Sequence, residues 1–237
     1  MKLSAPIFQL KRRAKLMARN SGVSLNQALD QIAREEGFPQ WSLLSANVSS
    51  SPLSETVLSQ LLPGDLLLIG GRPGHGKTKL GLRLLLDGVR NGRKAFLFTL
   101  EFTDQQARKH LKALDAPSGD AAEAVRIFTS DQIDADYIIQ QMSEVEPGTI
   151  AVIDFLQLLD QQRSKPVLSE QLQTLHEFAK RKGAVLGFMS QIDRSFDTGG
   201  KRLPDIGDVR LPNFIDLGLF SKACFVHNGE AQLQNVA

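Results

Sequence analysis

The sequence has few of the residues that build disulfide-linked or zinc-binding folds. Its 237 residues include one cysteine, Cys224, and four histidines that lie far apart. A single cysteine excludes an intrachain disulfide and fits a reducing cytosol, and the scattered histidines lack the spacing of zinc ligands. Cys224 lies in an apolar run, so we expect a buried core residue and not a nucleophile. The sequence therefore indicates a cytoplasmic protein.

Long apolar runs and an excess of charge of one sign are also missing. The apolar stretches are interrupted at Asp65, Arg72 and Asp154, well short of the roughly 20 residues that a membrane helix needs. The net charge is only +2, so the whole chain is no polycation. Hydrophobic residues make up 42%, which is typical of a globular protein with a buried core. We expect no membrane partner.

Residues 1–48 predict a small all-α N-terminal module. Apolar residues at helical spacing predict two helices, and the second begins after Ser24, where Gln27 completes a capping box. A third, shorter helix is expected around Leu44. The serine-rich segment 47–52 is expected to link this module to the rest of the chain.

The first helix of this module is basic. It carries no acidic residue, and its cations are Lys11, Arg12, Arg13, Lys15 and Arg19. Such a stripe can meet DNA or an acidic partner, but a solvated helix face has the same pattern. The sequence leaves both interpretations open.

Residues 53–237 alternate between apolar strands and amphipathic helices. Strands are predicted over 65–70, 94–100, 125–128, 149–154, 184–190 and 222–227, and helices over 77–91, 103–114, 135–145 and 168–182. This alternation predicts an α/β domain whose mainly parallel sheet is flanked by helices on both faces. In such sheets, ligands bind beyond the carboxyl ends of the strands.

A complete phosphate-binding loop joins the first of these strands to its helix. It reads Gly71-Arg72-Pro73-Gly74-His75-Gly76-Lys77-Thr78, with Lys79 directly after it, and matches G-x-x-x-x-G-K-T/S. The glycines let backbone N–H groups turn toward phosphate oxygens, and the positive end of the helix lies behind the anion. Lys77 is expected to reach the β- and γ-phosphates, and the Thr78 hydroxyl to bind Mg²⁺. The motif predicts a nucleoside triphosphate site.

Two predicted strands end in a carboxylate. Asp154 ends an apolar run and is expected to hold Mg²⁺ through water, although many buried strands also end in aspartate. Glu101 is placed to accept a proton from the attacking water, as a general base. A solvated glutamate at the start of the next helix is the alternative for Glu101.

The strand that ends in Gln191 is followed by a basic loop, residues 192–213. Gln191 is placed to sense the γ-phosphate, and a structural role in a turn fits the local sequence equally well. The cations of the loop are Arg194, Lys201, Arg202 and Arg210. A basic, glycine-containing loop can grip a nucleic-acid backbone, but four aspartates dilute its charge, so a mobile surface loop is the alternative.

Taken together, these segments resemble the RecA-like motor domain of the replicative DnaB helicase family, from about Leu53 onward. The resemblance rests on Arg72-Pro73 inside the phosphate loop, Phe98-Thr99-Leu100-Glu101, Asp154-Phe155-Leu156-Gln157-Leu158, Ser190-Gln191-Ile192-Asp193-Arg194 and Asp208-Val209-Arg210. It implies a RecA-like P-loop NTPase fold that binds ATP and Mg²⁺ and hydrolyses ATP. It also implies a homo-oligomer of the hexameric ring type, with single-stranded DNA in a central channel.

The sequence departs from the family pattern in two places. The family continues into a hairpin with a Lys-x-Arg arginine finger, about where this sequence reaches Ala237, and Leu211-Pro212-Asn213 stands where the family has Glu-Ser-Gly. An arginine supplied by a neighbouring subunit contributes about 10³–10⁵-fold in rate. A self-assembled ring is therefore expected to hydrolyse ATP poorly, unless another basic residue takes that role.

We expect an ATPase that acts on single-stranded DNA, such as a helicase in DNA replication. One alternative is a regulatory protein that binds ATP and hydrolyses it poorly. Another is an accessory or loading subunit for a replicative helicase or other replication protein. Glu101 favours the enzyme, because a pure ATP-binding protein has no need of a general base.

Overall fold

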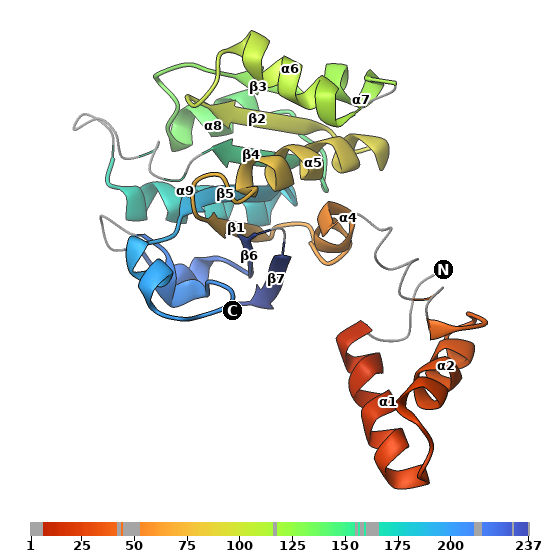
Figure 1. Ribbon diagram of the computed structural model, residues 1–237. Helices are drawn as coiled ribbons and strands as arrows, with labels where there is room; N and C mark the ends of the chain where they lie inside the picture. Colours follow the sequence, from red (N-terminus) through yellow and green to blue (C-terminus); the bar gives the residue numbers. More distant parts are fainter. Residues whose placement is uncertain are drawn as a thin grey trace. The chain divides into compact units, whose positions relative to one another are not determined.

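The computed structural model describes residues 7–41, 44, 53–115, 118–154, 156, 159, 166–210, 215–228 and 230–236. The chain forms two units, Met1–Pro52 and Leu53–Ala237 (Figure 1). None of the described helices has the length and apolarity that a membrane crossing needs.

The described part of the first unit is helical, with α1 (Ile7–Ser21) and α2 (Leu25–Glu35). The capping box is confirmed, because the Gln27 N–H donates to Ser24 Oγ at 3.2 Å and the Ser24 N–H donates to Gln27 Oε1 at 3.0 Å. Its core contains Leu10, Ala14, Ala28, Ile32, Ala33 and Leu44, with Trp41 packed against it. The third helix expected near Leu44 and the serine-rich linker lie mostly outside the described residues.

In the described residues of the second unit, seven strands form one sheet in the order β3-β2-β4-β5-β1-β6-β7. The strands are β1 (Leu66–Gly71), β2 (Ala95–Thr99), β3 (Arg126–Phe128), β4 (Ile150–Asp154), β5 (Val185–Gln191), β6 (Lys222–His227) and β7 (Glu230–Asn235). All strand pairs are parallel except β6 with β7, which is antiparallel. The predicted fold class, a mainly parallel α/β sheet flanked by helices, is confirmed.

Helices cover both faces of this sheet and complete two apolar cores. One core joins Leu66 and Leu68 of β1 to α8 (Ala135–Gln141) and α9 (Leu168–Lys182). The other core joins Leu67 and Ile69 to the helices α4 (Leu53–Leu58), α5 (Lys77–Arg90), α6 (Asp104–Leu114) and α7 (Asp120–Ala124). Because successive side chains of a strand point to opposite faces, a strand buried on both sides reads as a continuous apolar run.

Two elements differ from the sequence-based prediction. β7 was not predicted, because only Ala231 and Leu233 are apolar among its polar residues, and it forms a half-exposed edge of the sheet. α8 ends at Gln141 and not at residue 145, and a turn at Pro147 and Gly148 then leads into β4.

Cys224 is fully buried in β6, as expected from its apolar run. Burial raises the pKa of its thiol to about 12, so the reactive thiolate is scarce at neutral pH. We expect Ellman's reagent to leave Cys224 unmodified in the native protein and to titrate one thiol after unfolding in urea. Rapid modification of the native protein would show that β6 opens readily.

Candidate nucleotide site

The phosphate loop lies between β1 and α5, at the carboxyl edge of the parallel strands. Gly74 and Gly76 have φ angles of 83° and 100°, and a Cβ atom at either position would meet nothing within 4 Å. The turn therefore uses backbone geometry that glycine adopts easily, and it leaves open space above it. α5 begins after Gly76 with no side-chain cap and no acidic residue in its first turn. Its N–H groups and positive dipole end are available to an anion.

The two candidate carboxylates lie at the ends of adjacent strands. Thr99, the last residue of β2, is in register with Asp154, the last residue of β4. The Glu101 N–H donates to Thr99 Oγ1 at 3.0 Å, which fixes the backbone two residues beyond β2. The sheet thus brings Glu101 to the edge where Asp154 ends its strand.

Asp154 is a buried carboxylate with an unused oxygen. Its side chain is 1% exposed, and Oδ1 has no hydrogen-bond partner among the described residues. Burial raises its pKa to about 6, the Lys77 ammonium lowers that pKa, and the Glu101 carboxylate raises it. Lys77, Asp154 and Glu101 are therefore near enough to sense one another's charge.

This donor set fits a hard divalent cation such as Mg²⁺. A buried carboxylate is costly unless a positive charge compensates it, and Oδ1 of Asp154 lacks a protein partner in the described structure. Mg²⁺ prefers one or two carboxylates together with phosphate oxygens and water. Thr78, in the first turn of α5, is half-buried and adds a hydroxyl oxygen.

Gln191 ends β5 beside the phosphate loop. It is in register with Gly71 of β1, and its side chain is half-buried. Its carbonyl oxygen accepts the Arg210 N–H at 2.8 Å. Gln191 thus connects the strand next to the phosphate loop with both ends of the following loop.

A cavity of about 190 Å³ opens beside the phosphate loop. It lies between α4, the start of α5 and the β6–β7 hairpin, and its lining includes Ser54, His75, Lys79, Arg83, Val226 and Glu230. Ser54 Oγ is buried and has no hydrogen-bond partner among the described residues. The cavity offers room and polar groups next to Gly76, where a phosphate chain would begin.

Sequence comparisons give distant relatives. No protein-family model matches the sequence. The DNA repair protein RadA of Salmonella typhimurium is 25% identical over 206 residues, which cover 84% of this chain and 42% of that protein. RadA of Escherichia coli is 24% identical over 206 residues with the same coverage. The chain spans less than half of the length of these curated relatives.

Solved structures agree more fully with the fold. A solved ATPase domain of the DnaB-like helicase type matches with a TM-score of 0.56 at 17% identity, covering 81% of this chain and 91% of that one. A DnaB-like replicative helicase, described with its interactions with primase, matches with a TM-score of 0.57 at 17% identity, covering 97% and 74%. The second unit has the fold of a DnaB-type RecA-like ATPase domain.

Intramolecular ion pairs hold two of the four candidate DNA-contacting cations of the RecA-like domain. Lys201 Nζ lies 2.9 Å from Asp205 Oδ2 and 3.0 Å from Asp208 Oδ2. Arg202 binds both carboxylate oxygens of Glu230, at 2.8 and 2.6 Å. Arg194 and Arg210 are exposed. Exposed ion pairs are weak, at about 0–1 kcal/mol, so a phosphate can replace these partners.

The sequence did not reveal which residues of the RecA-like domain contact the phosphate loop from outside. Arg72 forms an ion pair with Asp197 of η2 (Arg194–Thr198) at 2.9 Å. His75 stacks on His227, with ring centroids 4.5 Å apart. Phe196 is buried, so of its two expected roles the core role applies, while Phe214 and Gln157 lie outside the described residues.

Proposed function

We propose that the RecA-like domain binds and hydrolyses ATP with Mg²⁺ and uses this cycle to act on single-stranded DNA. The observation that carries the proposal is the buried Asp154 carboxylate with its unused oxygen, placed within electrostatic reach of Lys77 and Glu101. Structural ion pairs also perturb pKa values, but they do not leave a buried carboxylate oxygen unpartnered beside an uncapped helix.

The phosphate loop would bind the triphosphate. Backbone N–H groups of residues 71–79 surround the phosphates, and Lys77 binds the β- and γ-phosphates. Thr78 and Asp154 are the residues that would hold Mg²⁺, which when bound neutralises charge on the phosphate oxygens. The cavity beside His75 would take the nucleoside part of the ligand.

Glu101 would act as the general base. Its carboxylate accepts the proton of the water that attacks the γ-phosphate, while Lys77 stabilises the charge that develops on the transferred group. Gln191 lies at the end of the strand next to the phosphate loop and would respond to the presence of the γ-phosphate.

The loop after Gln191 would contact single-stranded DNA through Arg194, Lys201, Arg202 and Arg210. The names of the relatives support a DNA-directed role, since they include a DNA repair protein and a DnaB-like replicative helicase. By the same analogy we propose a homo-oligomer of the hexameric ring type that works with other replication proteins in the cytoplasm.

Salt dependence of DNA binding gives a direct test of the loop. Each phosphate contact with single-stranded DNA contributes about 0.7 to the slope of log affinity against log salt, so four contacts give a slope of about −3. An Arg194→Gln variant is expected to reduce the slope by about 0.7. Lys112→Gln, at an exposed ion pair of α6, serves as the matched control and should leave the slope unchanged.

The enzymatic part is tested by measuring ATP turnover with and without single-stranded DNA at low salt. Turnover should rise with DNA, and Lys77→Ala should remove nucleotide binding. Turnover that ignores DNA, or a Lys77→Ala protein with full activity, would contradict the proposal. Solution mass with nucleotide bound reports the oligomer in the same samples.

A second candidate function is a regulatory or helicase-loading protein that binds ATP with little hydrolysis. The observation in its favour is the pairing of Lys201 and Arg202 with acidic residues of the same chain, which lowers the free positive charge of the loop. It predicts tight ATP binding, slow turnover, and co-purification with a replicative helicase.

A further inference from the structure

A direct link connects the phosphate loop with the loop over residues 192–210. The Arg72 guanidinium lies 2.9 Å from Asp197 Oδ2, and its Nε donates to both Asp197 carboxylate oxygens at 3.2 and 3.3 Å. A third nitrogen donates to the Ile192 carbonyl oxygen at 3.2 Å. The Arg72 side chain is only 18% exposed, so this arginine is held firmly between two segments 125 residues apart.

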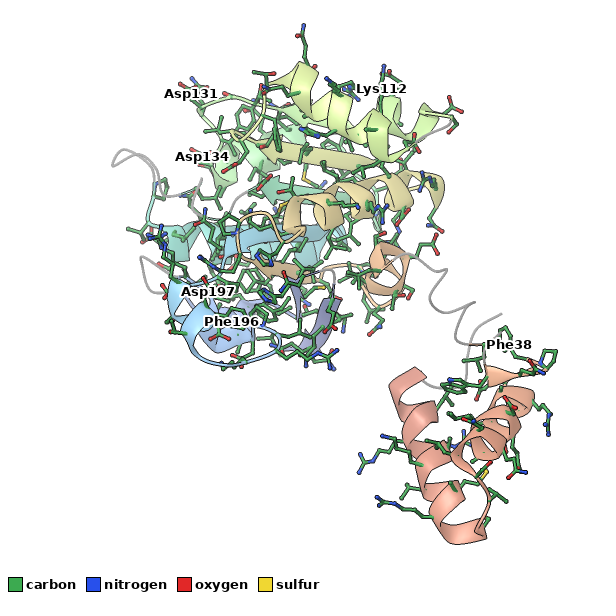
Figure 2. All side chains as sticks on the ribbon, in the orientation of Figure 1. Phe38, Lys112, Asp131, Asp134, Phe196 and Asp197 are labelled. Atoms are coloured by element: carbon green, nitrogen blue, oxygen red, sulfur yellow. The ribbon has the colours of Figure 1, made fainter. Side chains whose placement is uncertain are left out.

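A second link runs beside the first. Phe196, next to Asp197 on η2 (Figure 2), packs edge-on against His227 with ring centroids 5.0 Å apart. His227 in turn stacks on His75 of the phosphate loop, and His75 Nδ1 accepts the Asn228 N–H at 3.2 Å. Two neighbouring residues of η2 therefore contact the phosphate loop through different partners.

The 192–210 loop is closed at its base, so a movement at η2 reaches the whole loop. Ile192 and Val209 form an antiparallel bridge, and the Asp193 N–H donates to the Asp208 carbonyl oxygen at 2.8 Å. Lys201 ties the far side together through its contacts with Asp205 and Asp208. Arg194, the first residue of η2, lies three positions from Asp197 and shares its short helix.

We propose that Arg72 is a positioning residue that couples occupancy of the phosphate loop to the order of the 192–210 loop through Asp197. This inference rests on the proposed function, because it requires a nucleotide in the phosphate loop. A triphosphate fixes the backbone at residues 71–76, this fixes Arg72, and Arg72 then restrains η2. Coupling free energies are reciprocal, so a ligand of the 192–210 loop strengthens nucleotide binding by the same factor.

Hydrogen exchange of the full-length chain tests this coupling with a non-hydrolysable ATP analogue and Mg²⁺. The analogue should slow exchange of residues 71–79 in every variant. In wild type it should also slow exchange of residues 192–210 by about fivefold or more, the low end of typical coupling. In Asp197→Asn this second effect should disappear, and Asp197→Glu, which keeps the charge, should restore part of it.

A matched control and the protection pattern separate the possible failures. Glu146→Gln removes an exposed ion pair with Lys94 at 2.8 Å and should respond like wild type. If residues 71–79 show no protection in wild type, the proposed function fails and this inference fails with it. If they are protected but residues 192–210 do not respond, or respond equally in Asp197→Asn, the coupling is overturned while the nucleotide site stands.

Discussion

A Glu101→Gln variant is expected to hydrolyse ATP about 10²–10⁴-fold more slowly than wild type while it still binds ATP. The amide keeps the shape of the side chain but cannot accept the proton of the attacking water. It also removes a negative charge that raises the pKa of Asp154, so nucleotide binding has no electrostatic reason to weaken. Phosphate release measures kcat, and a fluorescent ATP analogue measures affinity.

Glu123→Gln is the control for this experiment, because Glu123 is an exposed carboxylate paired with Lys112 at 2.6 Å. It should leave both kcat and affinity at wild-type values. If Glu101→Gln turns over ATP as fast as wild type, Glu101 is the solvated glutamate that the sequence left open. The protein would then be the regulatory ATP-binding protein of the second candidate function.

The sequence predicted the nucleotide-site candidates because their signals are local. A phosphate loop needs its residues at consecutive positions, and apolar strands that end in Asp154 and Gln191 place those side chains at one edge of a parallel sheet. The parallel order of β4, β5 and β1 then follows from the alternation of strands and helices.

The contacts that surround this site were not predictable in the same way. Arg72 and Asp197 are 125 residues apart, and nothing in the local sequence of either residue indicates its partner. The stacking of His75 on His227 requires that β6 lie next to β1, which depends on strand order and not on a motif. β7 was missed because an edge strand buries too few side chains to show clear alternation.

Asp154→Asn is expected to stabilise the domain at neutral pH while it impairs Mg²⁺-dependent hydrolysis. The pKa of Asp154 is raised from 3.8 to about 6 in the folded protein, chiefly by burial. Below about pH 4 both the folded and the unfolded chain hold this proton, so the residue costs nothing. As pH rises through 6 the folded protein must ionise a buried group, and it loses up to about 3 kcal/mol of stability.

An asparagine has no such ionisation, so the stability difference between the variant and wild type should be small at pH 4 and should grow up to about pH 7. Urea unfolding of metal-free protein, followed by far-ultraviolet circular dichroism, measures this difference. Fluorescence of Trp41, the only tryptophan, is unsuitable because it reports on the N-terminal unit. Asp104→Asn, at an exposed carboxylate in the first turn of α6, is the matched control. A difference that does not change with pH, or a variant less stable than wild type at pH 8, would show that the Asp154 carboxylate is well compensated by its surroundings. Such a result would remove the physical reason for placing a cation beside it, since a carboxylate already satisfied by the protein gains little from Mg²⁺.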